Sequence, residues 1–164
     1  AQTGAREMGR GKMALNRPAP SLYFVVVFWG PQYRQWFLDL LLPSLLSPNN
    51  LPALPKSAPH RLLIVTLNED WEQLQKHPAF LKCRELIEPV HLRMSPPSAH
   101  ANKYLVMSRG HQEATRKAFN DRACGVFLTP DLVLSDGSVR SLYRLALEGK
   151  HVVLCAAMRF AQVR

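Results

Sequence analysis

The chain lacks the features by which several broad classes of protein are recognised. Its longest uninterrupted apolar run, Leu22–Trp29, falls far short of the roughly 18 to 20 residues that a membrane-spanning helix needs. No internal repeat shows at the periods of solenoids or propellers. The three cysteines lie far apart and form no Cys-x-x-Cys pair, so a disulfide framework is excluded and we expect a reducing, cytoplasmic compartment.

The short motifs of several enzyme families are also missing. No Gly-x-Gly-x-x-Gly follows the first apolar run, which argues against dinucleotide or methyl-donor binding of the usual kind. There is no phosphate loop of the GKS or GKT type and no Gly-x-Ser-x-Gly nucleophile elbow. His111-Gln112-Glu113 matches the start of a zinc deaminase motif, but the Pro-Cys-x-x-Cys that would complete it is absent.

The composition is that of a globular protein with a basic surface. Of the 164 residues, 47% are hydrophobic and 20% are charged, which suits one domain of ordinary size. The net charge of +9 suits phosphate-bearing ligands, and it is equally compatible with a surface that is basic only for solubility. Residues 1–20 hold four basic residues against one acidic residue and show no apolar period. We therefore expect a flexible basic leader over 1–20 and a folded domain over 21–164.

The hydrophobic pattern predicts strands that alternate with helices. Short runs rich in β-branched and aromatic residues predict buried strands at Leu22–Phe28, Leu62–Leu67, Leu86–Met94, Gly125–Leu128 and Val152–Ala156. Pro89 predicts that the third of these is an edge or split strand. The segments between them repeat apolar residues at helical spacing, and Pro43 is expected to end or kink the first helix. The order predicts a Rossmann-like α/β fold, with a mainly parallel sheet of about five strands flanked by helices.

Ligands of such sheets bind beyond the carboxyl ends of the strands. The residues that follow the predicted strands, and are our candidates for binding, are Trp29, Gly30, Asn68, Glu69 and Asp131. A carboxylate at the position of Asp131 can hold a hard cation such as Mn²⁺ or Mg²⁺ that bridges two phosphates. The alternative is that Asp131 only caps the turn after Pro130, and for Asp136 we favour such a capping role at the following helix.

Two stretches of the chain carry a resemblance to a known family. Trp29–Leu54 resembles the amino-terminal segment of GT-A-fold, nucleotide-sugar glycosyltransferase-like proteins, and Tyr104–Arg159 is similar to their middle portion. The run Leu42–Leu54 is the most specific part and has a structural character. Within the second stretch the matching positions fall in the expected order, namely His111, Ala114, Ala118, Phe127–Asp131, Gly149 and Arg159.

The resemblance implies a GT-A domain that binds a nucleoside diphosphate sugar for glycosyl transfer. Trp29 and Gly30 would meet the base, and Asn68 and Glu69 would approach the base or ribose. Asp131 would take the place of the family's metal- and diphosphate-binding acidic motif, with Mn²⁺ or Mg²⁺ as the cation. The usual Asp-x-Asp is absent, which leaves metal dependence open, and no catalytic residue is assigned. Such enzymes continue well past Arg164 into an acceptor-binding half, so we expect 21–164 to be incomplete and inactive alone.

Two other functions remain open at this point. The chain could be a non-catalytic α/β binding module, the remnant of a longer enzyme that binds a nucleotide and transfers nothing. The net charge of +9 also raises nucleic-acid binding. The sequence has no recognition-helix motif, aromatic RNA-binding signature or basic helix face, so we expect no specific nucleic-acid partner.

Overall fold

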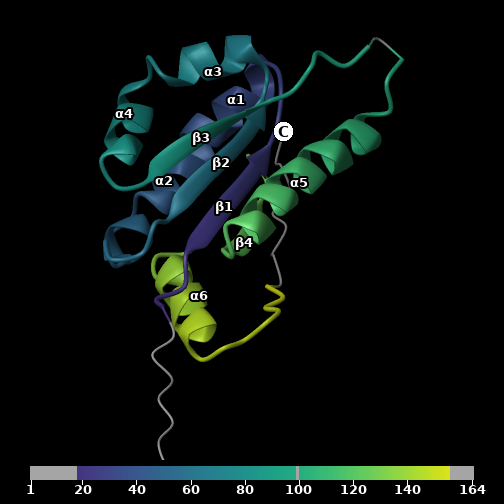
Figure 1. Cartoon of the computed structure of the whole chain (residues 1–164). Helices are drawn as coiled ribbons and strands as arrows, with labels where there is room; N and C mark the ends of the chain where they lie inside the picture. The colour runs from purple at the N-terminus through teal and green to yellow at the C-terminus, as the bar shows by residue number, and fades with distance from the viewer. Residues whose placement is uncertain (1–17, 99, 156–164) are drawn as a thin grey trace, which may run out of the picture.

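The computed structural model describes residues 18–98 and 100–155, and these form a parallel sheet covered by helices (Figure 1). The sheet has four strands in the order β3-β2-β1-β4. Every neighbouring pair is parallel, with Val27 beside Val65 and Val26 beside Leu128. The strands are β1 (Leu22–Val27), β2 (Arg61–Thr66), β3 (Glu88–Arg93) and β4 (Cys124–Leu128). The predicted α/β class and parallel sheet are confirmed.

The central strands carry uninterrupted apolar runs, Leu22–Val27 in β1 and Leu62–Val65 in β2, because both faces of the sheet are covered. Successive side chains of a strand point to opposite faces, which divides the core into two layers. Phe24 and Ile64 belong to the larger layer, and Val25 and Val65 belong to the smaller one. All four side chains are fully buried. The core therefore lies on both sides of β1 and β2.

The larger layer is covered by helices from several parts of the chain. They are α1 (Pro31–Trp36), η1 (Phe37–Leu41), α2 (Leu42–Leu45), α3 (Asn68–Leu74), α4 (Pro78–Arg84) and α6 (Ser138–Leu147), with the short η2 (Leu51–Ala53) beside α6. The opposite face carries α5 (Lys103–Asn120), which crosses from β3 to β4 (Figure 1). None of the described helices combines the length and the apolarity needed to cross a membrane.

The helix α5 packs unusually close to the sheet at Gly110. A Cβ atom at this position would lie 2.7 Å from Val27 Cγ1 and 3.2 Å from Val65 Cγ1. Ala114 and Ala118 follow on the same face of the helix and are buried. Small residues at this spacing let the helix backbone approach β1 and β2, so the close contact depends on the absence of a side chain at Gly110.

The helix that begins at Pro31 runs through Pro43 and does not end there. The N–H of Leu42 donates to the carbonyl of Phe37, five residues earlier, and the turn Phe37–Leu41 is a π-helix. A proline lacks an N–H and its ring crowds the preceding turn, and a wider π turn relieves both problems. Of the two expectations for Pro43, that it ends or kinks the helix, the first is wrong, because the chain widens one turn and continues to Leu45.

The structure does not confirm a fifth strand. The described part of the expected strand, Val152–Cys155, pairs with no strand, and Val152 and Leu154 are 77% and 92% exposed. Ala156 lies outside the described residues, as do residues 1–17 of the expected leader. The two edges of the sheet are thus β3 and β4. The prediction from Pro89 that the third strand is an edge strand is confirmed.

A buried asparagine in the loop after α2 caps α6 from a distance in the sequence. Asn50 is fully buried, and its Oδ1 accepts the N–H groups of Gly137 at 3.1 Å and Val139 at 2.9 Å. Its Nδ2 donates to the carbonyls of Ser44 at 2.8 Å and Ser135 at 3.1 Å, and also to a serine hydroxyl. The first N–H groups of a helix need such acceptors, and this one comes from another part of the chain.

Asp136 has a different role from the one predicted. Its carboxylate accepts the backbone N–H and the side-chain Nδ2 of Asn49, both at 2.7 Å. These hydrogen bonds lower the pKa of Asp136. The cap of α6 is Asn50, so the prediction that Asp136 caps this helix is wrong. Asp136 instead holds the loop that carries Asn50 in place.

Candidate functional site

The carboxyl ends of the four strands meet at one edge of the sheet. Strands β1, β2 and β3 follow one another in one direction, and α5 then brings the chain back to place β4 on the other side of β1. The order of the strands reverses between β1 and β4. In open parallel sheets, ligands bind beyond the carboxyl ends at this point of reversal.

The register places the predicted binding residues along this edge. Val26 of β1 pairs with Leu128 of β4. Trp29 follows Val26 by three residues and Asp131 follows Leu128 by three residues, so both lie at the same edge of the sheet. Asn68 and Glu69 follow β2 at the same edge and are exposed, while Trp29 and Gly30 are half-buried and Asp131 is exposed. Among the described residues no hydrogen bond joins one of these five side chains to another. They share one edge of the sheet without forming a connected network.

A buried carboxylate behind this edge was not among the predicted site residues. Asp70, in the first turn of α3, is 2% exposed. Its Oδ2 accepts the N–H of Gly30 at 2.7 Å, and its Oδ1 accepts from Nη1 of Arg34. Gly30 has a φ of 87°, in the region that favours glycine. Asp70 therefore fixes the loop that follows β1 in a conformation that few other residues adopt.

The ion pair between Arg34 and Asp70 explains how the carboxylate can be buried. An unpaired buried charge is costly, whereas a carboxylate with charged and neutral donors on both oxygens is satisfied. The side chain of Arg34 is itself only 21% exposed, so solvent screens the pair weakly. An acid in the first turn of a helix also suits the helix dipole. The contacts with Gly30 and Arg34 join segments far apart in the chain, and no local pattern indicates them.

The donor set at this edge does not form a preformed metal site. The described residues include no group of three or more His, Cys, Asp or Glu side chains that could hold a metal. Both oxygens of Asp70 accept hydrogen bonds from Gly30 and Arg34, so the exposed carboxylates at this edge are those of Asp131, the predicted ligand, and Glu69. Hard cations take six or more oxygen ligands, so Asp131 fits a cation only if the ligand's own phosphates supply most of the others.

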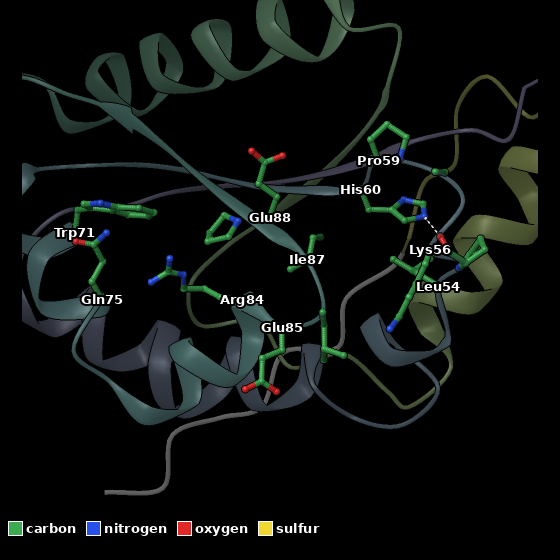
Figure 2. A pocket seen from close by; sticks show the side chains of 14 residues that line it. Leu54, Lys56, Pro59, His60, Trp71, Gln75, Arg84, Glu85, Ile87 and Glu88 are labelled. Atoms are coloured by element: carbon green, nitrogen blue, oxygen red, sulfur yellow. Dashed lines mark hydrogen bonds between the residues drawn. The ribbon is translucent and has the colours of Figure 1, made fainter.

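A groove of about 660 Å³ lies away from this edge, toward the starts of β2 and β3 (Figure 2). Its walls come from the loop before β2, from α3 and from the end of α4. Its lining includes two basic residues, Lys56 and Arg84, and two acidic residues, Glu85 and Glu88, and Glu88 is paired with Nε of Arg61 at 2.7 Å. None of the five predicted binding residues lines this groove. Its charges are mixed, and they indicate no particular ligand.

Two buried titratable groups have structural roles. His60 Nδ1 accepts the N–H of Leu22 at 3.0 Å, and Nε2 lies 3.2 Å from the carbonyl of Pro55, as Figure 2 shows. Burial lowers the pKa of His60, which keeps the ring neutral with one nitrogen accepting and the other donating. Burial raises the pKa of the Cys83 thiol to about 12, so this cysteine is no thiolate nucleophile.

Comparison with known proteins adds nothing to this geometry. The chain matches no family model, no curated protein and no solved structure.

Proposed function

We propose that the chain binds a nucleoside diphosphate sugar at the carboxyl edge of β1, β2 and β4. It would serve as the donor-binding part of a GT-A-fold, glycosyltransferase-like protein in the cytoplasm. The observation that supports the proposal best is the reversal of strand order between β1 and β4. Trp29, Gly30 and Asp131 follow these two strands at the same edge.

Each residue would contribute a contact suited to its chemistry. The Trp29 indole offers a flat apolar surface for the base, and Gly30 lets the backbone approach the ligand closely. The Asn68 amide and the Glu69 carboxylate can hydrogen-bond base or ribose hydroxyl groups. Asp131 would hold a Mn²⁺ or Mg²⁺ ion that neutralises charge on the diphosphate.

The proposed reaction is a displacement at the anomeric carbon of the sugar. An oxygen of an acceptor forms a bond to this carbon, and the bond to the diphosphate oxygen breaks with its electron pair. The acceptor loses a proton, and the nucleoside diphosphate is released. We assign no base and no acceptor contact to the described residues, so the proposed part of the site is the donor side.

A calorimetric titration of the 164-residue chain with UDP and with GDP, with and without Mn²⁺, tests the proposal. We expect binding that Mn²⁺ strengthens, and a loss of about tenfold or more in affinity in Asp131→Ala, because a contact to a charged group contributes about 1.5–3 kcal/mol. Glu148→Ala is the matched control, since it removes one exposed carboxylate from the end of α6. Absence of binding to both nucleotides with Mn²⁺, or equal loss in both variants, would contradict the proposal.

A binding module without chemistry is the second candidate. The lack of a preformed cation site favours it, because the described residues include no group of three or more His, Cys, Asp or Glu side chains that could hold a metal. Both candidates predict nucleotide binding, and they differ in the fate of a bound nucleotide sugar. Release of nucleoside diphosphate from UDP-glucose or GDP-mannose above the rate without protein would support the transferase. Binding with no release would support the module.

A further inference from the structure

The loop that joins β1 to α1 contains a backbone conformation that is essentially restricted to glycine. Gly30 has a φ of 87° and a ψ of 162°. Apart from its chain neighbours, no atom of the described residues lies within 4 Å of the place that a Cβ would take. The backbone conformation, and not a lack of space, therefore requires glycine here. Sparsely populated conformations cluster at ligand-binding and active sites, where the surrounding structure holds them in place.

Two residues hold both polar backbone groups of Gly30. The N–H of Gly30 donates to Oδ2 of Asp70 at 2.7 Å, and its carbonyl accepts the backbone N–H of Arg34 at 3.1 Å. The ring closes because Nη1 of Arg34 donates to Oδ1 of Asp70. Each of the three contacts fixes the geometry of the other two. The loop can therefore change its conformation only by breaking at least one of them.

The ion pair in this ring is a weak stabiliser of the fold. Both side chains are largely shielded from solvent. The loss of hydration offsets much of the attraction between two buried charges, so apolar residues of similar volume often stabilise a protein as well or better. Arg34 lies four residues after Gly30, and Asp70 lies in the first turn of α3, beside the carboxyl edge of the sheet. We therefore look for the function of the pair in the shape of the loop at this edge.

The same ring determines where the side chain of Trp29 lies. The N–H of Phe28 donates to the carbonyl of Val65 at 3.1 Å, so β1 stays joined to β2 up to the residue before Trp29. Gly30 follows directly and is held by Asp70. Trp29 is thus placed between two fixed residues, and a change at Gly30 would move its indole.

We propose that Asp70 and Arg34 are positioning residues that hold the Gly30 loop in the shape that binds the ligand. They fix the place of the Trp29 indole, and they keep the open space beside the Cα of Gly30 available to the nucleotide. Both act through Gly30 and not on the reacting atoms. The inference rests on the proposed nucleotide-sugar binding and assigns two further residues to that same site.

Calorimetric titration of the full chain with GDP and with UDP in Mn²⁺, together with NMR hydrogen exchange at the Gly30 amide, tests the inference. Asp70→Asn leaves one acceptor oxygen for two donors, so the ring opens. We expect the nucleotide affinity to fall about tenfold or more, and exchange at Gly30 to become at least about tenfold faster. Glu148→Gln is the matched control, since it makes the same change in the exposed pair with Arg144 and should behave like the wild type.

Gly30→Ala perturbs the same loop and leaves the ion pair in place. Its methyl group has no described atom within 4 Å beyond the chain neighbours, so the substitution acts on the backbone conformation. We expect a similar loss of affinity. The combined variant with Asp70→Asn should lose no more, within about threefold, than the weaker-binding single variant, because both act through one loop. Urea denaturation of each variant shows that it is folded at the temperature of the titration.

Several results would overturn the inference. Unchanged affinity in Asp70→Asn, with binding by the wild type, overturns it and leaves the proposed function standing. Loss of affinity without faster exchange at Gly30 also overturns it, because Asp70 would then act by another route. Losses that multiply in the combined variant contradict a shared loop. Absence of binding to both nucleotides in the wild type contradicts the proposed function, and the inference falls with it.

Discussion

The side chain of Asn50 connects three segments, namely the end of α2, the turn before α6 and the start of α6. Its Oδ1 accepts two N–H groups at the start of α6, and its Nδ2 donates to the carbonyls of Ser44 and Ser135. Asn50 itself is fully buried. Replacing Asn50 with alanine removes every one of these hydrogen bonds and leaves the partner groups in place. We expect a large loss of stability from this single substitution.

The expected loss follows from two contributions. The cap of α6 contributes about 1 kcal/mol, the usual effect of removing an N-cap acceptor. The donations to the carbonyls of Ser44 and Ser135 and to the hydroxyl of Ser47 contribute about 0.5–1.5 kcal/mol each, because the acceptors stay largely shielded from water. Together they predict a decrease of about 3–4 kcal/mol in the free energy of unfolding, a substantial part of the ~5–15 kcal/mol typical of a domain.

Urea denaturation of the full chain measures this decrease. Asn50→Asp is the informative partner variant, because it keeps the acceptor for α6 and places a carboxylate oxygen against the carbonyls of Ser44 and Ser135. We expect this variant to lose about 2 kcal/mol or more. Asn120→Ala is the matched control, since Asn120 is exposed at the end of α5 and should change stability by less than about 0.5 kcal/mol.

A small effect would refute this reasoning. If Asn50→Ala lowers the free energy of unfolding by less than about 1 kcal/mol, water replaces the amide at little cost and the buried network is not what holds α6. If Asn50→Asp is as stable as the wild type, the donor half of the side chain contributes nothing. In either case the packing of Val139 and Tyr143 against the core would be the main support of α6.

Two further predictions concern the core and the pH dependence of stability. Gly110→Ala adds a methyl group 2.7 Å from Val27 Cγ1, so α5 must move; we expect a loss of about 1–3 kcal/mol although alanine favours helices, and a stability gain in denaturation would contradict the close contact. The lowered pKa of His60 means that the unfolded state binds a proton more readily. The contribution of neutral His60 to the free energy of unfolding is therefore fully present above about pH 6.5. It is lost as the pH falls below this value. His60→Asn keeps an acceptor for the N–H of Leu22, and its free energy of unfolding should fall less between pH 7 and pH 5 than that of the wild type. An equal fall in both proteins would mean that other groups cause the pH dependence.

The two central strands were predictable from the sequence because each contains an uninterrupted apolar run, Leu22–Val27 in β1 and Leu62–Val65 in β2. The first two strands shift by only one residue at an end between prediction and structure, and the long helix over Lys103–Asn120 follows its apolar spacing closely. Pro89 marked an edge strand because a proline has no N–H to donate to a neighbouring strand. The rule for parallel sheets also placed Trp29 and Asp131 at a common edge.

The features that the sequence did not reveal depend on contacts between distant segments. Asp70 and Asn50 look like ordinary first-turn and loop residues, and their roles depend on Arg34 and Val139 in other elements. Gly110 sits inside a helical pattern, where a glycine alone does not indicate which strand it will approach. The fifth strand was predicted from composition alone, and composition does not show whether a neighbouring edge is occupied.

The arrangement of the sheet has a consequence for how the chain folds. β1 pairs with β2 over a modest separation, whereas its other partner, β4, pairs Cys124 with Leu22, about a hundred residues earlier. During synthesis the first three strands and those helices of the larger layer that precede α5 can assemble while α5, β4 and α6 are still being made. Until α5 arrives, the apolar side of β1 and β2 has no cover, and exposed apolar surface of this kind favours aggregation of a nascent chain.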